Sequence, residues 1–400
     1  MKITGLKTFV IGSGWRNLIL LRLETDEPGL YGIGEATVQW GDEGMLGYLV
    51  SLEKRYLIGQ DPRDIEALWE RVYRNEYWRR DFFVCSALGG VEMACWDILG
   101  KSLGVPVWRL LGGKCRDRIR AYANGWYQVE RTPEAIAERA VKAVSMGYGA
   151  LKIDPFGAGS YEMEEREKAR SVEIIAAVRD ALGPDVELFI EMHGRFATHT
   201  AIEMCHRLAK FRPGWFEEPV PPENVQALLE VRRAVAHLGI PVAAGERLYT
   251  RYLYLDLFRL RAADIIQPDV CHAGGIAETR KIAAMAEAHY IPVAPHNACS
   301  PVGTMASLHV AACTPNFKIQ ETFDDMVEPW VRDAIIGRPL VKDGYFDLPD
   351  KPGLGVDLDE KVIAEHPPME GFMDFWKKGW EKRDTYSGTL ETRSAGKDER

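Results

Sequence analysis

The amino-acid sequence predicts an α/β protein, in which a modified (β/α)8, TIM-like barrel follows an N-terminal α+β domain. Strand-type and then helical segments fill the first part of the chain, and short apolar runs then alternate with amphipathic helical segments about eight times. Eight such runs fit a closed barrel better than an open doubly wound sheet. No GxGxxG follows an early strand, so a dinucleotide-binding fold has no support.

Composition excludes several classes of protein. The 400 residues are 46% apolar and 27% charged, which is ordinary for a globular chain. The net charge of -9 disfavours binding to nucleic acid or to an anionic membrane. The longest apolar runs fall short of the roughly 20 residues that a membrane span needs, and the N-terminus has no signal-peptide pattern. Seven widely spaced cysteines without a CxxC pair favour reduced thiols. We therefore expect a cytoplasmic protein with no nucleic-acid or membrane partner.

Residues 1–115 form the predicted N-terminal domain. Its first 60 residues are interpreted as β-rich, with strands in ITGLKTFVIG, NLILLRLETD and GLYGIGEAT. Residues 61–112 are interpreted as helical, because DPRDIEALWERVYRNEYW has apolar residues at helical spacing and a second, small-residue-rich stretch ends at Gly-Gly.

Residues 116–340 form the predicted barrel, and 341–400 form a C-terminal segment that returns to the first domain and ends in a polar, frayed tail. The apolar runs of the barrel are IRAYANGW, GALKIDPF, ELFIEMHG, GWFEEP, PVAAGE, DIIQPD, IPVAPH and FKIQET.

A charged or titratable residue recurs at the ends of these runs, at steps of about one strand–helix unit. The residues are Lys152, Asp154, Glu191, His193, Glu217, Glu246, Asp269, His296 and Glu321. Because the carboxyl ends of all barrel strands meet at one mouth, where barrel active sites lie, these side chains are predicted to converge there.

Glu191, Glu217 and Glu246 would lie on three adjacent strands. Converging carboxylates repel one another and take up protons unless a cation lies between them. Oxygen ligands without cysteine favour a hard cation, so we expect Mg²⁺. Glu218 would point to the opposite face from Glu217, so only one of the two is a candidate ligand.

Two histidines join this group. His296 and Asp269 end neighbouring runs, and a carboxylate beside an imidazole orients it and raises its basicity, as a general base requires. His193 is two residues after Glu191, so strand alternation would turn it to the mouth as well. The other histidines are interpreted as structural or exposed, with His272 left ambiguous.

Taken together, these residues resemble the mandelate racemase branch of the enolase superfamily over roughly residues 1–360. The motifs are IEMHGR, WFEEP, AAGER, IQPDVCHAGG, APHN and IQETF, with MACWDILGKSLGVPVWRLLGG in the first domain. The resemblance implies an N-terminal capping domain, three acidic metal ligands, an Asp–His dyad and a homo-oligomer.

Within that branch the sequence is more similar to the galactonate and gluconate dehydratases than to the racemases. The Glu191-x-His193-Gly-Arg195 element carries this similarity, and in those dehydratases a histidine at this place protonates the departing hydroxyl. Racemases have a Lys-x-Lys motif where this chain has Lys152-Ile153-Asp154. Relatives often have Asp where this chain has Glu191, which leaves the substrate subgroup open.

The resemblance and the residues together predict a Mg²⁺-dependent lyase that acts on a small sugar acid. His296, held by Asp269, would remove the C2 proton, and His193 would protonate the leaving 3-hydroxyl to give a 2-keto-3-deoxy acid. The C2 proton is more than ~10 pKa units less acidic than imidazolium, so a divalent ion must stabilise the developing charge. Lys152 would add a cation, and Glu321, if protonated, a hydrogen bond.

Specificity is expected from the capping domain and the neighbouring strand ends. Candidate substrate-binding residues are Trp15 and Arg16 in one loop, Asn124 and Trp126 with Tyr127 after the first barrel strand, and Asp154 and Arg195 at the mouth. The segment Trp40–Gly44 is a second loop that closes the mouth in this interpretation. Surface exposure for the loop residues and packing for the aromatic ones stay open as alternatives.

Three other functions remain alternatives. A racemase or epimerase would use Lys152 and His296 as bases on opposite faces, and a cycloisomerase would use the same enediolate chemistry. A non-catalytic binding protein is disfavoured, because every part of the proton-transfer set is present. The sequence leaves open which sugar acid is used, whether elimination is syn or anti, whether the ion is Mg²⁺ or Mn²⁺, and the oligomeric state.

Overall fold

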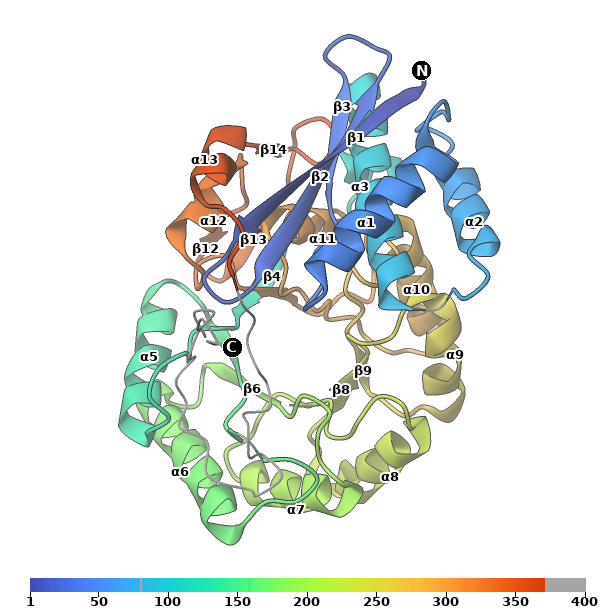
Figure 1. Cartoon of the computed structure of the whole chain (residues 1–400). Coiled ribbons are helices and arrows are strands. Elements are labelled where there is room, and N and C mark those ends of the chain that lie inside the picture. The colour runs from blue at the N-terminus through green and yellow to red at the C-terminus, as the bar shows by residue number, and fades with distance from the viewer. Residues whose placement is uncertain (80, 158, 371–400) are drawn as a thin grey trace, which may run out of the picture.

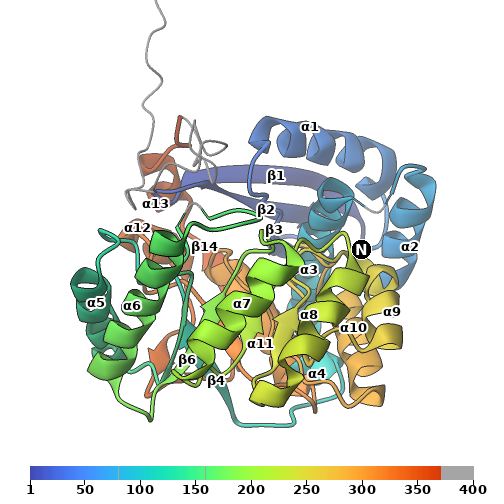
Figure 2. The same ribbon diagram turned by 90° about the horizontal axis from the view of Figure 1, so that it is seen from below.

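The computed structural model describes residues 1–79, 81–157 and 159–370. The predicted frayed tail lies outside the described residues. An N-terminal cap and a barrel make up most of the described chain (Figure 1), and the sheet and first helix of the cap lie across one end of the barrel (Figure 2).

The cap consists of an antiparallel sheet in the order β1-β2-β3 with helices packed on it. Its elements are β1 (Ile3–Gly12), β2 (Asn17–Thr25), β3 (Tyr31–Glu35), α1 (Asp42–Leu52), the π-helix η1 (Glu53–Leu57), α2 (Ile65–Asn75) and α3 (Phe82–Leu103). The three predicted strands are confirmed. The β-rich interpretation of residues 1–60 was wrong for α1 and η1, where Met45, Leu49 and Leu52 recur at helical spacing and are buried.

Helix α3 is the central helix of the cap. Asp81 caps its start by accepting from the Val84 N–H, and Gly104 ends it at a φ of 68°. Gly34 of β3 lets the strand approach closely, because a Cβ there would lie 2.0 Å from the Gly90 carbonyl oxygen. By length and composition α3 could cross a membrane, but 78% of its most apolar window is buried inside the fold, as in the core helix of a globular protein.

The barrel follows as alternating strands and helices. Its elements are α4 (Val107–Leu110), β4 (Arg118–Ala123), α5 (Pro133–Ser145), β5 (Ala150–Ile153), α6 (Glu165–Leu182), β6 (Glu187–Glu191), α7 (Thr198–Ala209), β7 (Phe216–Glu217), α8 (Val225–Val235), η2 (Ala236–Leu238), β8 (Val242–Ala244), α9 (Thr250–Leu260), β9 (Ile265–Ile266), α10 (Ile276–Ala288), α11 (Pro301–Cys313) and β10 (Gln320–Thr322).

Parallel pairing from β4 to β9 makes most of the ring. Single bridges join Ile266 to Val293 and Val293 to Phe317, and β10 pairs with β4 and closes the barrel. Counted within the described residues, the ring has eight staves, that is, seven strands and the segment at Val293 that is held by single bridges. They match the eight predicted apolar runs. The predicted fold class is confirmed.

One inward-facing layer fills the barrel, and each stave contributes one buried residue to it. The layer consists of Tyr122, Ala150, Phe189, Trp215, Ala243, Ile265, Ala294 and Ile319. Phe189 and Trp215 stack, and the ring of Tyr122 meets both edge-on. Because the interior is packed, the polar side chains at the strand ends sit on an apolar floor.

The C-terminal segment adds short elements to both parts. They are α12 (Pro329–Asp333), β11 (Ile335–Ile336), β12 (Val341–Lys342), β13 (Tyr345–Asp347), β14 (Asp357–Leu358) and α13 (Glu360–Glu365). Strand β13 pairs with β4, whereas α13 packs against β1 of the cap. The chain therefore returns to the cap after it leaves the barrel, and the two parts are tied together.

Candidate active site

Three glutamates converge at the carboxyl ends of consecutive barrel strands. Glu191 ends β6, Glu217 ends β7 and Glu246 follows β8. One carboxylate oxygen from each lies within 4.8 Å of the other two. Glu191 and Glu217 are fully buried, so their charges are screened little by solvent.

A buried lysine lies among these carboxylates. Lys152 of β5 is 1% exposed, and its Nζ is 3.1 Å from Glu191 Oε2 and 2.9 Å from Glu321 Oε1 and is bonded to Glu217 Oε1. Burial opposes its charge, but Glu217 and Glu321 raise the pKa of Lys152 well above its usual value. Lys152 therefore stays an ammonium.

The negative charge still exceeds the positive charge. Glu191, Glu217, Glu246 and Glu321 face one lysine, and burial together with the charge of Glu191 raises the pKa of Glu217 well above its usual value. Glu191 Oε2 is buried and finds no hydrogen-bond partner in the described part of the chain, although it lies in ion-pair range of Lys152. An all-oxygen donor set with surplus charge fits a hard divalent cation.

His296 and Asp269 form a dyad on the next staves. Asp269 follows β9 and is 1% exposed, and its Oδ2 lies 2.7 Å from Nδ1 of His296. The opposite nitrogen, Nε2, faces the glutamates, 3.5 Å from Glu246 Oε2. Burial opposes ionisation of Asp269, but His272 and the hydrogen bond from His296 lower its pKa to about 2. Asp269 therefore holds the imidazole as a carboxylate, with Nε2 turned to the site.

A second histidine–aspartate pair lies on the other side of the glutamates. His193 Nδ1 is 2.5 Å from Asp154 Oδ2, and Arg195 binds the same oxygen. The backbone N–H of His193 donates to Glu191 Oε1 at 2.6 Å. Burial disfavours a charged imidazole, but the carboxylates of Glu191 and Asp154 outweigh this effect and raise the pKa of His193. A protonated imidazolium is thereby favoured here, and a proton donor needs that form.

Comparisons with known proteins identify the family of this chain. Residues 6–112 match the family model described as "Mandelate racemase / muconate lactonizing enzyme, N-terminal domain", and 135–362 match "Enolase C-terminal domain-like". The chain therefore belongs to the mandelate racemase/muconate lactonizing enzyme family of the enolase superfamily. The family predicted from the sequence is confirmed.

Relatives cover almost the whole chain. It is 36% identical to a D-gluconate/D-galactonate dehydratase of Picrophilus torridus, over 94% of this chain and 95% of that protein. It is 35% identical to a D-galactonate dehydratase of Cronobacter sakazakii, over 96% and 98%. The predicted enzyme class, a hydro-lyase, is confirmed by these relatives.

Solved structures of the family share the fold. The mandelate racemase/muconate lactonizing enzyme from Jannaschia sp. CCS1 superposes with a TM-score of 0.84 at 36% identity, over 93% of this chain and 99% of that chain. The corresponding protein from a Sulfitobacter species gives 0.85 at 35%, over 92% and 96%.

Glu321 of β10 and Asn124, which follows β4, are hydrogen-bonded to each other beside Lys152. Glu321 accepts from Asn124 Nδ2 at 2.8 Å and from the Asn297 N–H at 3.0 Å, besides Lys152. Burial disfavours a charged carboxylate, but Lys152 and His296 outweigh this effect and lower the pKa of Glu321. The protonated Glu321 considered from the sequence is therefore not favoured in this arrangement.

The remaining sequence candidates are placed differently from one another. Trp126 is buried, and its indole donates to the Lys152 carbonyl at 2.8 Å, which fixes β5. Trp15 stacks on Phe323 just after β10, with ring centroids 6.2 Å apart. Arg16 is 3% exposed, lies over the Trp15 ring and donates to Gln39 at 3.1 Å. The loop between β1 and β2, which bears Trp15 and Arg16 and is called the cap loop, therefore contacts the end of the last barrel strand.

Sequence reasoning missed two residues. Arg247 binds the buried Glu218, with Nε 2.8 Å from Oε2, and the Asn297 N–H binds Glu321. A carboxylate next to Glu217 that cannot join the metal group needs a cation, and that requirement could have identified Arg247, directly after Glu246. No sequence signal pointed to a backbone donor such as that of Asn297.

Proposed function

We propose that this enzyme dehydrates a sugar acid of the aldonate type and uses Mg²⁺ held by Glu191, Glu217 and Glu246. The bound ion would neutralise the substrate carboxylate and stabilise the negative charge that develops when the C2 proton leaves. The single observation that carries the proposal is that His296 and His193 flank one glutamate group, each fixed through Nδ1 by its own aspartate.

The two histidines have different tasks in this reaction. His296 Nε2 removes the C2 proton, while Asp269 keeps the Nδ1 side fixed. His193 donates a proton to the 3-hydroxyl, which leaves as water, and the enol product relaxes to a 2-keto-3-deoxy acid. Lys152 attracts the substrate carboxylate by its charge, Glu321 holds the Lys152 ammonium in place, and Asp154 and Arg195 orient His193.

Lys152 distinguishes this reaction from epimerisation. A lysine base must be neutral, yet its Nζ lies in contact with three carboxylates, and its pKa is raised well above the usual value. The His193 side supplies an imidazolium acid instead of a second base. The arrangement supports elimination over racemisation, epimerisation and cycloisomerisation.

The far end of the substrate is assigned to the cap loop. Arg16 is buried, and its Nε and one terminal guanidinium nitrogen have no hydrogen-bond partner within the described residues. An unsatisfied guanidinium favours an oxygen-rich ligand, such as the distal hydroxyls of a sugar acid. Trp15, Asn124 and Trp126 would complete the wall, and the segment Trp40–Gly44 would close it.

The organisation of the chain belongs to the same proposal. We assign residues 1–115 to the cap, 116–340 to the barrel and 341–400 to a C-terminal segment, of which 341–370 are described and return to the cap. The enzyme is proposed to be a cytoplasmic homo-oligomer, with a small sugar acid as its partner and no nucleic acid or membrane.

A library of sugar acids covering all configurations at C2 to C5 tests the function. With Mg²⁺ present, semicarbazide-reactive 2-keto acid should form from at least one member, and Arg16→Ala should raise KM for that member more than it lowers kcat. Deuterium at C2 without any keto acid, in deuterated water, would indicate epimerisation and contradict dehydration.

A further inference from the structure

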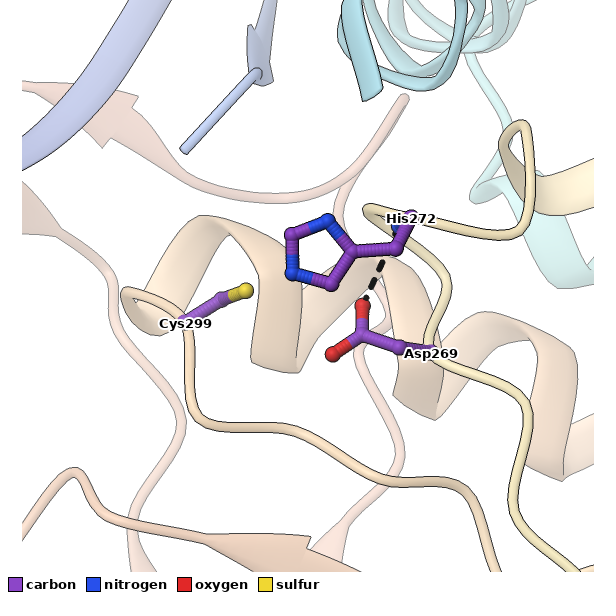
Figure 3. Close-up of side chains that lie close together, drawn as sticks. All are labelled: Asp269, His272 and Cys299. Carbon is purple, nitrogen blue, oxygen red and sulfur yellow. Dashed lines mark hydrogen bonds between the residues drawn. The ribbon is translucent and has the colours of Figure 1, made fainter. Parts of the chain in front are cut away.

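A second cluster of donor atoms lies behind the dyad. Asp269 and His272 are on the loop after β9, and Cys299 is on the loop before α11 (Figure 3). One ligand atom from each lies within 4.8 Å of the other two. The imidazole of His272 presents a ring nitrogen toward the Cys299 sulfur (Figure 3).

The donor atoms of this cluster differ from those of the glutamate group. It offers one carboxylate oxygen, one imidazole nitrogen and one thiol sulfur, whereas the glutamates offer oxygen alone. Mixed nitrogen and sulfur donors select Zn²⁺ or Co²⁺ over Mg²⁺. Ligand atoms on a tetrahedral zinc lie roughly 3.5 Å apart, so separations of up to 4.8 Å need to shorten by about 1.3 Å at most.

Neighbouring residues already orient the donors. Ser86 Oγ of the cap helix α3 lies 2.9 Å from His272 Nδ1, so Nε2 is the ring nitrogen that faces Cys299. Such a hydrogen bond to the distal nitrogen is the usual support of a metal-binding histidine. Glu35, also from the cap, accepts from the Ser300 N–H at 2.9 Å and the Gly303 N–H at 3.0 Å, which fixes the loop that bears Cys299.

Asp269 belongs both to the dyad with His296 and to the cluster with His272 and Cys299. Its Oδ1 accepts from the Cys271 N–H at 2.7 Å, and its Oδ2 accepts from His296. A cation that took a lone pair of Oδ2 would compete with the His296 hydrogen bond. Occupancy of the cluster would therefore act on the proposed base without touching the glutamate group.

We propose that Asp269, His272 and Cys299 form a second metal site, which takes one Zn²⁺-like divalent cation and inhibits the enzyme by drawing Asp269 away from His296. Binding displaces the thiol proton of Cys299 into solvent, and no group is oxidised or reduced. The inhibition rests on the proposed function, whereas the binding does not.

Absorption of Co²⁺ tests the binding directly, because only a thiolate ligand gives an intense sulfur-to-cobalt band in the near ultraviolet. The full-length protein, kept in excess Mg²⁺, should develop this band on titration with Co²⁺. Cys299→Ser should abolish it, and Cys205→Ser, which changes a buried thiol in α7, should leave it unchanged. No band in the wild type, or a band that survives Cys299→Ser, overturns the proposal.

Two further measurements test the site without Cys299→Ser, in case that variant fails to fold. His272→Gln, which can keep a hydrogen bond to Ser86, should weaken Co²⁺ binding at least tenfold; unchanged binding contradicts the site. X-ray absorption of the wild-type protein with two equivalents of Zn²⁺ should show a sulfur neighbour at about 2.3 Å. Oxygen and nitrogen neighbours alone would overturn the proposal irrespective of the enzyme's substrate.

Zinc inhibition tests the consequence separately. In saturating Mg²⁺, the Zn²⁺ concentration that halves activity should rise at least tenfold in Cys299→Ser and stay unchanged in Cys205→Ser. Equal sensitivity of both variants, with the Co²⁺ band confirmed, would overturn the inhibitory role and leave the proposed function standing.

Discussion

Nδ1 of His296 lies 2.7 Å from Oδ2 of Asp269, across two neighbouring staves of the barrel. The contact fixes which ring nitrogen faces the site, because the other one, Nε2, lies 3.5 Å from Glu246. A base that removes a weakly acidic carbon proton needs this orientation before the substrate arrives.

Replacing His296 should stop the first proton transfer. His296→Asn keeps a polar side chain but removes the base, so exchange of the C2 proton and keto-acid formation should both fall by about 10³-fold. Proton NMR of the sugar acid in deuterated water measures the exchange. His237→Asn, at an exposed position on η2, is the control. Exchange at the wild-type rate in His296→Asn would exclude His296 as the base.

His193 should separate exchange from elimination. His193→Asn removes the proton donor whose pKa Glu191 and Asp154 raise, so C2 exchange should persist while keto-acid formation falls about 10²-fold or more. Both rates come from one sample, by NMR and by semicarbazide assay. Full dehydration by this variant would remove His193 from its role.

The affinity for Mg²⁺ should depend on the glutamates at the carboxyl ends of the barrel strands. Glu191→Gln removes a charged ligand and should weaken Mg²⁺ binding by about 100-fold or more, and Glu217→Gln should act alike. Glu187→Gln is the matched control, because Glu187 lies at the opposite end of the same strand and pairs with Arg120. Calorimetry measures the affinity. Undiminished activity in excess chelator would contradict a metal cofactor.

Stability at mildly acidic pH should depend on His309. This buried histidine of α11 accepts from the Trp108 N–H at Nδ1 and contacts the Leu354 carbonyl through Nε2, which requires a neutral ring. Burial lowers its pKa to about 4, below the unfolded value of about 6.5. The unfolded chain thus binds the proton first, and about 3 kcal/mol of stability, complete above pH 6.5, is lost as pH falls through 4.

Urea unfolding at pH 7 and pH 5 measures this effect. His309→Gln keeps both hydrogen bonds without a titrating ring and should lose less stability between the two pH values than the wild type. An equal loss in both would show that other groups cause the acid sensitivity.

The barrel could be predicted because apolar runs and helical segments alternate regularly along the sequence. The convergence at its mouth could be predicted because charged residues recur at the ends of those runs. The last residues of each apolar run lie at or just after the end of a barrel strand, so Glu191, Glu217 and Asp269 could be placed at one mouth from order alone. Helix α1 was missed because its apolar spacing lies within a segment dominated by strand-type residues.

Finer geometry was less predictable. Strand alternation was used to turn His193 to the mouth, but β6 ends at Glu191 and His193 has a φ of 48°, so the loop and the bond to Asp154 place it instead. The charge of Glu321 likewise follows from Lys152 and a backbone donor brought together only by folding. Local patterns do not encode contacts between distant staves.

The central claim is that Glu191, Glu217 and Glu246 bind the same divalent ion. A crystal of the protein grown with Mn²⁺ and measured at the manganese absorption edge tests this most directly. We predict one strong anomalous peak, with a carboxylate oxygen of each glutamate at coordination distance. An anomalous map with no peak between these three side chains, while the crystal binds Mn²⁺ elsewhere, would contradict the account.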